Sequence, residues 1–237
     1  MQPEQRPIPQ RQMGSHRPLP LLMRNLQKRV ARCSRCELSQ TRQRTVFARG
    51  NLQASVCFVG EAPGAQEDAQ GKPFVGRAGR LLDEMIEKAG LPVAEAYFCN
   101  IVKCRPPDNR RPRPPEVVAC GDHLHEQLSI WSRSLPTPAS KRIIVALGKT
   151  AIETLLGARV DVGDLRGQWK LYRGRVLLMP TYHPSFLLRP FKSQQRSRQQ
   201  VADDLQRVVA ELGIAGASSG PAKPALYVIP GGRGSTP

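Results

Sequence analysis

A chain of 237 residues is long enough for one domain with a sizeable hydrophobic core. Its 36 Lys and Arg against 19 Asp and Glu give a formal charge of +17, which makes nucleic acid the first candidate partner and an anionic membrane surface the second. There is no run of 18 apolar residues and no secretory signal, so we expect a cytosolic protein without a transmembrane helix.

Composition divides the chain into three parts. Residues 1–20 are rich in Pro, Gln and Arg and are expected to form a disordered basic tail. Residues 213–237 are rich in small residues, Pro and Gly and are expected to form a second disordered tail. The residues between them, 21–212, are expected to form one domain.

Within this domain, apolar strands alternate with helical patterns. In chain order we predict a helix over 21–32, a strand over 55–60, a helix over 79–89, a strand over 96–102, a helix over 115–128, a strand over 142–147, a helix over 150–156, a strand over 175–179 and a helix over 199–212. The alternation is typical of an α/β fold with three layers, α/β/α, around a central, mostly parallel four-stranded sheet. In such folds, functional residues follow the carboxyl ends of the strands.

The six cysteines of a cytosolic protein argue against three disulfides. Cys57 and Cys99 lie within apolar strands and are expected to pack as small hydrophobic residues. Four others are candidate metal ligands: Cys33, Cys36, Cys104 and Cys120. Their spacing leaves open a tetrahedral zinc ion, an iron–sulfur cluster, or a redox pair with two incidental cysteines.

Four side chains near the strand ends suit a nucleobase. Glu61 can position a water or stabilise a cation, and the Asn100 amide can pair with a base edge. Phe74 lies in a loop between Gly and Pro residues and can stack on a base. His183 precedes a proline in a short loop and can donate to a developing anion. Three of them also have a structural interpretation: Glu61 as a turn cap, Phe74 as a core-packing ring and His183 as a hydrogen-bonded structural histidine.

Nine motifs follow one another along the chain: Cys33-x-x-Cys36-x-Leu38, Thr45-Val-Phe-Ala-Arg-Gly-Asn51, Gly60-Glu-Ala-Pro-Gly64, Glu67-Asp68, Pro73-Phe-Val-Gly-Arg-Ala-Gly79, Asn100-Ile-Val-Lys-Cys-Arg-Pro-Pro107, Ala146-Leu-Gly148, Leu165-Arg-Gly167 and His183-Pro-Ser-Phe-Leu-Leu-Arg189. In this order they resemble the family-four uracil-DNA glycosylases, the iron–sulfur enzymes of bacteria and archaea. The resemblance runs from about Leu22 to Leu212. The tails fall outside it.

The resemblance implies that a 4Fe–4S cluster binds the four candidate cysteines and plays a structural part. It also implies that uracil is flipped out of DNA and its N-glycosidic bond is hydrolysed, which releases free uracil and leaves an abasic site. The residues that it assigns to uracil are Glu61, Ala62, Pro63, Glu67, Phe74, Asn100 and His183.

Three of these residues are implied to be catalytic. Glu61 would position the water or support the oxocarbenium-like sugar, Asn100 would read the polar edge of uracil, and His183 would stabilise negative charge on uracil O2. Phe74 would stack on the base, and Glu67 would help to exclude the thymine methyl group.

The loop after the last strand is implied to contact DNA. Phe186, Leu187 and Leu188 resemble the wedge that fills the gap left by a flipped base, and Arg189 would hold a phosphate. Where the family usually has His-Pro-Ala-Tyr, this loop has His-Pro-Ser-Phe, so the wedge region lacks a hydroxyl group.

Two other functions compete with this one. Some relatives stay covalently attached to the abasic site through a histidine in an added loop, but residues 76–82 contain neither the insertion nor a histidine, so we expect ordinary turnover. A non-catalytic nucleic-acid-binding protein with a structural or redox-sensing cluster would explain the charge and the cysteines, but it would not need the four strand-end side chains. We therefore expect a monomeric, monofunctional glycosylase that acts on uracil-containing DNA in a bacterial nucleoid, and no membrane partner.

Overall fold

The computed structural model describes residues 19–134, 141–190 and 194–214. Most of the two predicted tails therefore lies outside the described residues, and their disorder stays a prediction. At the N-terminal boundary the prediction was two residues too long, because Leu19 and Pro20 form the first turn of helix α1 (Leu19–Ala31). A proline is tolerated there because the first turn of a helix has no intrahelical partner for its N–H groups.

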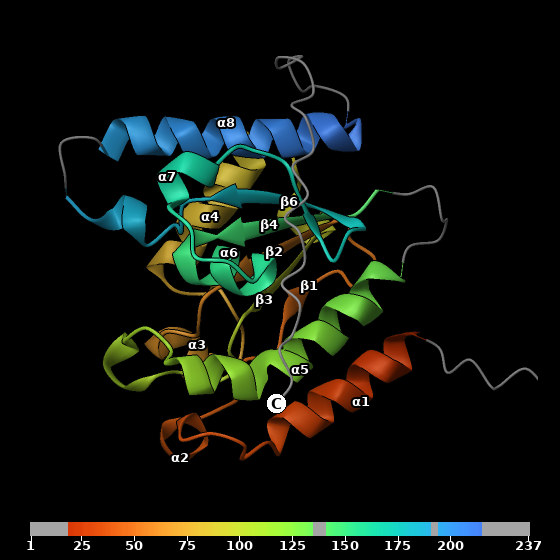
Figure 1. Cartoon of the computed structure of the whole chain (residues 1–237), viewed down its shortest axis with the longest axis vertical. Helices are drawn as coiled ribbons and strands as arrows, with labels where there is room; N and C mark the ends of the chain where they lie inside the picture. The colour runs from red at the N-terminus through yellow and green to blue at the C-terminus, as the bar shows by residue number, and fades with distance from the viewer. Residues whose placement is uncertain (1–18, 135–140, 191–193, 215–237) are drawn as a thin grey trace, which may run out of the picture.

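A mixed β-sheet forms the middle layer of the fold (Figure 1). In the described part of the chain its strands are β1 (Arg49–Gly50), β2 (Val56–Gly60), β3 (Ala96–Asn100), β4 (Ile143–Leu147), β5 (Lys170–Tyr172) and β6 (Val176–Thr181). Their order is β1-β3-β2-β4-β6-β5, with the four inner strands parallel and both edge strands antiparallel. The mostly parallel α/β sheet is confirmed, but the predicted number of four strands was wrong. The edge strands β1 and β5 have two and three residues, too few to show an alternating pattern.

Helices cover both faces of the sheet (Figure 1). Helices α4 (Arg77–Lys88) and α8 (Gln194–Leu212) cover one face, and α1, α5 (Pro114–Ser132) and α6 (Gly148–Leu156) cover the other. The three layers of the prediction are thus present. None of the described helices has the length and apolar character of a membrane span.

The connections contain short elements that the sequence patterns did not predict. They are the helices α2 (Leu38–Thr41), α3 (Ala65–Gln70) and α7 (Val162–Leu165), and the 3-10 turns η1 (Val93–Glu95), η2 (Pro107–Asn109) and η3 (Phe186–Leu188). Elements of three to six residues are too short for a helical apolar stripe, so periodicity cannot reveal them.

The strand order also sets the position of a cleft. Strands β3 and β4 lie on opposite sides of β2, so the chain reverses its direction across the sheet between them. In open parallel sheets, ligands bind where the order reverses, outside the carboxyl ends of the strands. Away from this edge, the strands are covered by the hydrophobic core. Cys57 and Cys99 lie in this core and are fully buried, as predicted.

Candidate active site

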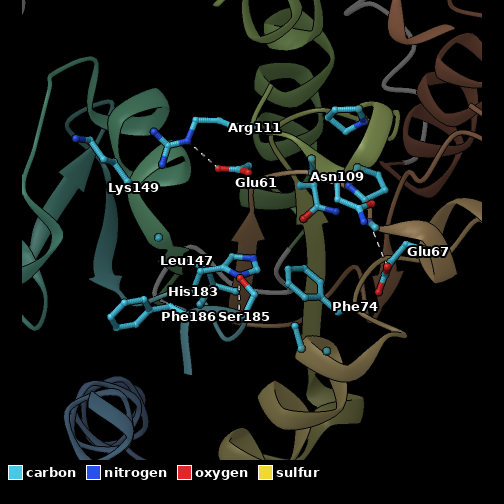
Figure 2. Close-up of a pocket in the computed structure, with 18 of the residues that line it drawn as sticks. Glu61, Glu67, Phe74, Asn109, Arg111, Leu147, Lys149, His183, Ser185 and Phe186 are labelled. Carbon is cyan, nitrogen blue, oxygen red and sulfur yellow. Dashed lines mark hydrogen bonds and ion pairs between the residues drawn. The ribbon is translucent and has the colours of Figure 1, made fainter. Parts of the chain in front are cut away.

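A cavity of about 550 Å³ lies at the carboxyl ends of the inner strands. All seven residues predicted to contact uracil line it: Glu61, Ala62, Pro63, Glu67, Phe74, Asn100 and His183. Two residues of the predicted DNA-contacting loop, Phe186 and Arg189, line it as well. The structure therefore brings together side chains from three regions that are far apart in the sequence, after β2, at the end of β3 and after β6 (Figure 2).

The loop that carries Phe74 is held in an unusual conformation. Phe74 has a φ of 56°, in the left-handed region that non-glycine residues rarely adopt. Its ring lies 6.0 Å from the ring of Phe98 and 6.4 Å from that of His183, measured between centroids. The Phe74 ring and the Asn100 amide both approach Gly60, where a Cβ would lie 2.5 Å from Phe74 Cζ and 2.6 Å from Asn100 Oδ1. Glycine at position 60 thus lets the aromatic ring and the amide line the same space.

Glu67 stabilises this loop. Its carboxylate accepts hydrogen bonds from the main-chain N–H groups of Val75 (3.0 Å), Gly76 (2.7 Å) and Gly64 (3.2 Å). The carboxylate therefore ties the first turn of α3 to the chain directly after Phe74. Glu67 also lines the cavity, and its part in excluding a thymine methyl group stays a prediction.

Glu61 follows β2, and two residues that the sequence patterns did not single out hold its carboxylate. The Thr150 hydroxyl of α6 donates a hydrogen bond to it. Arg111 Nε lies 3.6 Å from it, and Figure 2 shows the two side chains facing each other. Arg111 comes from the loop between Cys104 and α5, with its side chain 59% exposed. No local sequence pattern could have revealed these partners, because both are distant from Glu61 in the sequence. Thr150 is separated from Glu61 by 89 residues, and strand β3 lies between Glu61 and Arg111.

Ser185 fixes the tautomer of the neutral His183 ring. The Ser185 main-chain N–H donates to His183 Nδ1 (3.1 Å), and the Ser185 hydroxyl lies 2.8 Å from the same atom. Because a main-chain N–H can only donate, Nδ1 carries no proton and the neutral ring has its proton on Nε2. Burial, with a further contribution from the Arg189 charge, lowers the pKa of His183 to about 4. The ring is thus a neutral donor at neutral pH.

The rest of the His183 loop departs from the prediction at one residue. Phe186 and Leu188 are partly exposed, whereas Leu187 is fully buried in the core beneath α8. In this conformation the Leu187 side chain cannot enter DNA, because turn η3 directs it into the apolar layer between the sheet and α8. Of the three residues of the predicted wedge, Leu187 is thus excluded, and the role of Phe186 and Leu188 stays a prediction.

The four candidate cysteines meet at a second, smaller cavity, lined by Cys33, Cys36, Cys104 and Cys120. Arg42 Nη1 lies 3.1 Å from Cys104 Sγ. Burial raises the pKa of Cys104 to about 11, and the Arg42 guanidinium opposes this rise. In the described part of the chain, no three Cys, His, Asp or Glu side chains converge on a point where they could hold one metal ion. The four cysteines therefore lie around the same small cavity, and the group that they bind stays a prediction.

Comparison with known proteins identifies the family. The model of the uracil DNA glycosylase superfamily matches residues 47–206. The chain is 40% identical to a type-4 uracil-DNA glycosylase of Thermotoga maritima over 187 residues, which cover 78% of this chain and 92% of that protein. It is 39% identical to a type-4 uracil-DNA glycosylase of Pyrobaculum aerophilum (70% and 85% covered) and 38% identical to one of Saccharolobus solfataricus (67% and 74% covered). The chain therefore belongs to the uracil DNA glycosylase superfamily and, within it, to the type-4 family.

Proposed function

We propose that this protein excises uracil from DNA as a monofunctional glycosylase. The observation that carries the proposal is the convergence of Glu61, Phe74, Asn100 and His183 on one cavity at the strand ends. The cavity volume of about 550 Å³ is in the range of small-molecule sites and leaves room for a base with its sugar. A flipped uracil would stack on Phe74, and its polar edge would face the Asn100 amide.

The chemistry follows from the protonation states in the cavity. When the N-glycosidic bond breaks, its electron pair stays with uracil, negative charge spreads to O2, and the sugar becomes oxocarbenium-like. His183 would donate from Nε2 to O2, since Nδ1 is occupied as an acceptor. The Glu61 carboxylate would stabilise the sugar cation and orient the water that adds to C1′. The products are free uracil and an abasic site.

We also propose that the four cysteines hold a 4Fe–4S cluster. Thiolates are the ligands that such clusters take, and the four cysteines line one cavity. When bound, the cluster would crosslink the segment after α1 to the loop after β3 and to α5.

The cysteine assignment has a direct test. Cys120→Ala is expected to lose iron and the visible absorption of the cluster, because it removes one of the four ligands and leaves no donor atom in its place. Cys57→Ala is the matched control, because Cys57 is a buried cysteine of the same domain that does not line the cysteine cavity. Equal iron content in the two variants would show that the ligand set is wrong.

Outside the cavity, the proposed partner is DNA. Arg189 would contact a phosphate, and Phe186 and Leu188 would fill the gap that the flipped base leaves. Such a substrate places the protein with the bacterial chromosome in the cytoplasm. A monomer would suffice, since one chain supplies all the side chains named here.

The experiment that tests the function uses an oligonucleotide with one uracil. The purified protein is incubated with it and the product is treated with alkali, which breaks the strand at an abasic site. We expect cleavage by the wild type and loss of most activity in His183→Ala and Asn100→Ala. DNA binding without a strand break would favour a non-catalytic binder, and an adduct that survives denaturant would contradict ordinary turnover.

A further inference from the structure

Lys103 is a buried cation between the cysteine cavity and the uracil cavity. Its side chain is among the largest fully buried ones, with 1% of the residue exposed. Its ammonium group donates to the main-chain carbonyl of Asn100 (2.7 Å) and to Oε1 of Gln127 (2.5 Å). The same residue lines the cavity of the four cysteines. Lys103 thus lines the cysteine cavity and donates to the main chain of Asn100, a residue that lines the uracil cavity.

The hydrogen-bond partners of this ammonium group do not balance its charge. Both are neutral oxygens, and among the described residues no carboxylate forms an ion pair with Lys103. The second partner, Gln127 of α5, is itself fixed, since its Nε2 donates to the Phe47 carbonyl (3.2 Å) and lies 2.9 Å from the Tyr97 hydroxyl. A charge removed from water is costly unless an opposite charge lies close by. The structure around Lys103 therefore calls for an anion that is not a carboxylate.

The cysteine cavity is the place where such an anion would lie. Lys103 directly precedes Cys104 in the chain and lines the same small cavity as Cys104 and Cys120. A cluster bound by four thiolates carries a net negative charge, because the thiolates outweigh the charge of the iron–sulfur core. Lys103 would then lie beside its counter-ion.

We propose that Lys103 is a positioning residue that links the two sites. Its charge balances that of the cysteine-bound cluster, and its hydrogen bond holds the main chain of Asn100 in place. The proposal rests on the proposed function, because it takes both the cluster and the uracil-reading role of Asn100 from it. Asn100 is the last residue of β3 and is 2% exposed, so the clamp on its carbonyl fixes the point from which its amide enters the cavity. Lys103 itself does not line the uracil cavity and would not touch the base.

The test compares two variants of the full-length, cluster-bearing protein. Lys103→Met removes both the charge and the donor, whereas Lys103→Gln removes the charge but keeps a donor on a slightly shorter chain. The readouts are iron content, the visible absorption, the reduction potential of the cluster, and the single-turnover rate on a uracil-containing oligonucleotide. Both variants are expected to lower the reduction potential, because losing a nearby positive charge favours the oxidised cluster. The rate is expected to fall about tenfold in Lys103→Met and to recover in part in Lys103→Gln.

A second buried cation provides the control. Arg142 is buried, stacks on Trp131 with its guanidinium carbon 4.6 Å from the ring centroid, and donates to Ala54 and Ser134, but it does not line the cysteine cavity. Arg142→Gln is expected to lower the thermal stability without changing the reduction potential. Failure of both Lys103 variants to retain iron, with full retention in Arg142→Gln, would support the counter-charge role.

The outcomes separate the inference from its premise. If the wild-type protein contains no iron, the proposed cluster is wrong, and with it the counter-charge role of Lys103. The glycosylase function is tested separately, by the oligonucleotide assay. With the cluster present, a wild-type potential in Lys103→Met would overturn the counter-charge role. A lowered potential with an unchanged rate would overturn the link to Asn100.

Discussion

A Cβ atom on Gly79 would lie 2.0 Å from the main-chain carbonyl oxygen of Phe74. Only glycine lets the Phe74 loop cross the first turn of α4 so closely, and this contact supports the left-handed conformation of Phe74.

Gly79→Ala is expected to push the Phe74 loop away from the cavity. A displacement of about 1 Å at a positioning residue can cost on the order of 100-fold in rate, so we expect a loss of that size in single-turnover uracil release. Gly121→Ala in α5 is the control, because no atom lies within 4 Å of the added Cβ apart from its chain neighbours and the backbone of its own helix, and it should react at the wild-type rate. Equal rates in the two variants would show that the Phe74 loop does not position the base.

At acidic pH, the dependence of the single-turnover rate on pH is expected to reflect the protonation of His183. Because the pKa of His183 is lowered from its usual 6.5 to about 4, the neutral donor persists well below pH 6. The single-turnover rate should therefore show no inflection near pH 6.5 and should fall with an apparent pKa of about 4. An inflection near 6.5 that disappears in His183→Ala would contradict the neutral tautomer.

The same shift makes a prediction for stability. Between pH 6.5 and about 4 the unfolded chain binds a proton at His183 that the folded chain does not, so the free energy of unfolding should fall as the pH drops through this window. Denaturant titrations at several pH values measure it. In His183→Ala this part of the pH dependence should be absent.

Glu67→Gln is expected to affect both stability and rate. An amide offers one acceptor oxygen in place of two and turns its NH₂ group toward main-chain donors, so hydrogen bonds to Gly64, Val75 or Gly76 are lost. The cost is about 1–3 kcal/mol of unfolding free energy, with a slower single-turnover rate because the Phe74 loop loosens. Glu84→Gln, an exposed carboxylate of α4, is the control. A thymine-releasing Glu67→Gln variant with unchanged stability would instead support direct exclusion of the methyl group.

Arg111→Ala is expected to weaken DNA binding more than folding. The pair with Glu61 is long, at 3.6 Å, and half-exposed on the arginine side, so its loss should change the unfolding free energy by less than about 0.5 kcal/mol. If Arg111 holds a phosphate at the cavity mouth, the slope of log affinity against log salt should fall by about one. Lys28→Ala, an exposed cation of α1 that does not line the cavity, should leave the slope unchanged. Identical slopes would remove Arg111 from the DNA interface.

The sequence by itself determined the layout of the domain. Apolar runs ended by glycine mark β2 and β4, and the 3.6-residue spacing of Leu82 and Ile86 marks α4, because these signals are local. Placing Glu61, Asn100 and His183 after strands was enough to predict that they would meet, since the parallel strands end at one edge. The burial of Cys57 and Cys99 followed from their apolar neighbours for the same reason.

Only the tertiary structure decided what each of these residues contacts. No local pattern encodes the contacts of Glu61 with Thr150 and Arg111. The same holds for the main-chain N–H groups that donate to Glu67 and for the hydrogen bond from Lys103 to the Asn100 carbonyl. Leu187 has the apolar character of a wedge, but turn η3 directs it into the core. Hydrophobic periodicity reports which face of an element is buried, whereas hydrogen-bond partners depend on how distant segments of the folded chain are brought together, and that is decided when the layers pack.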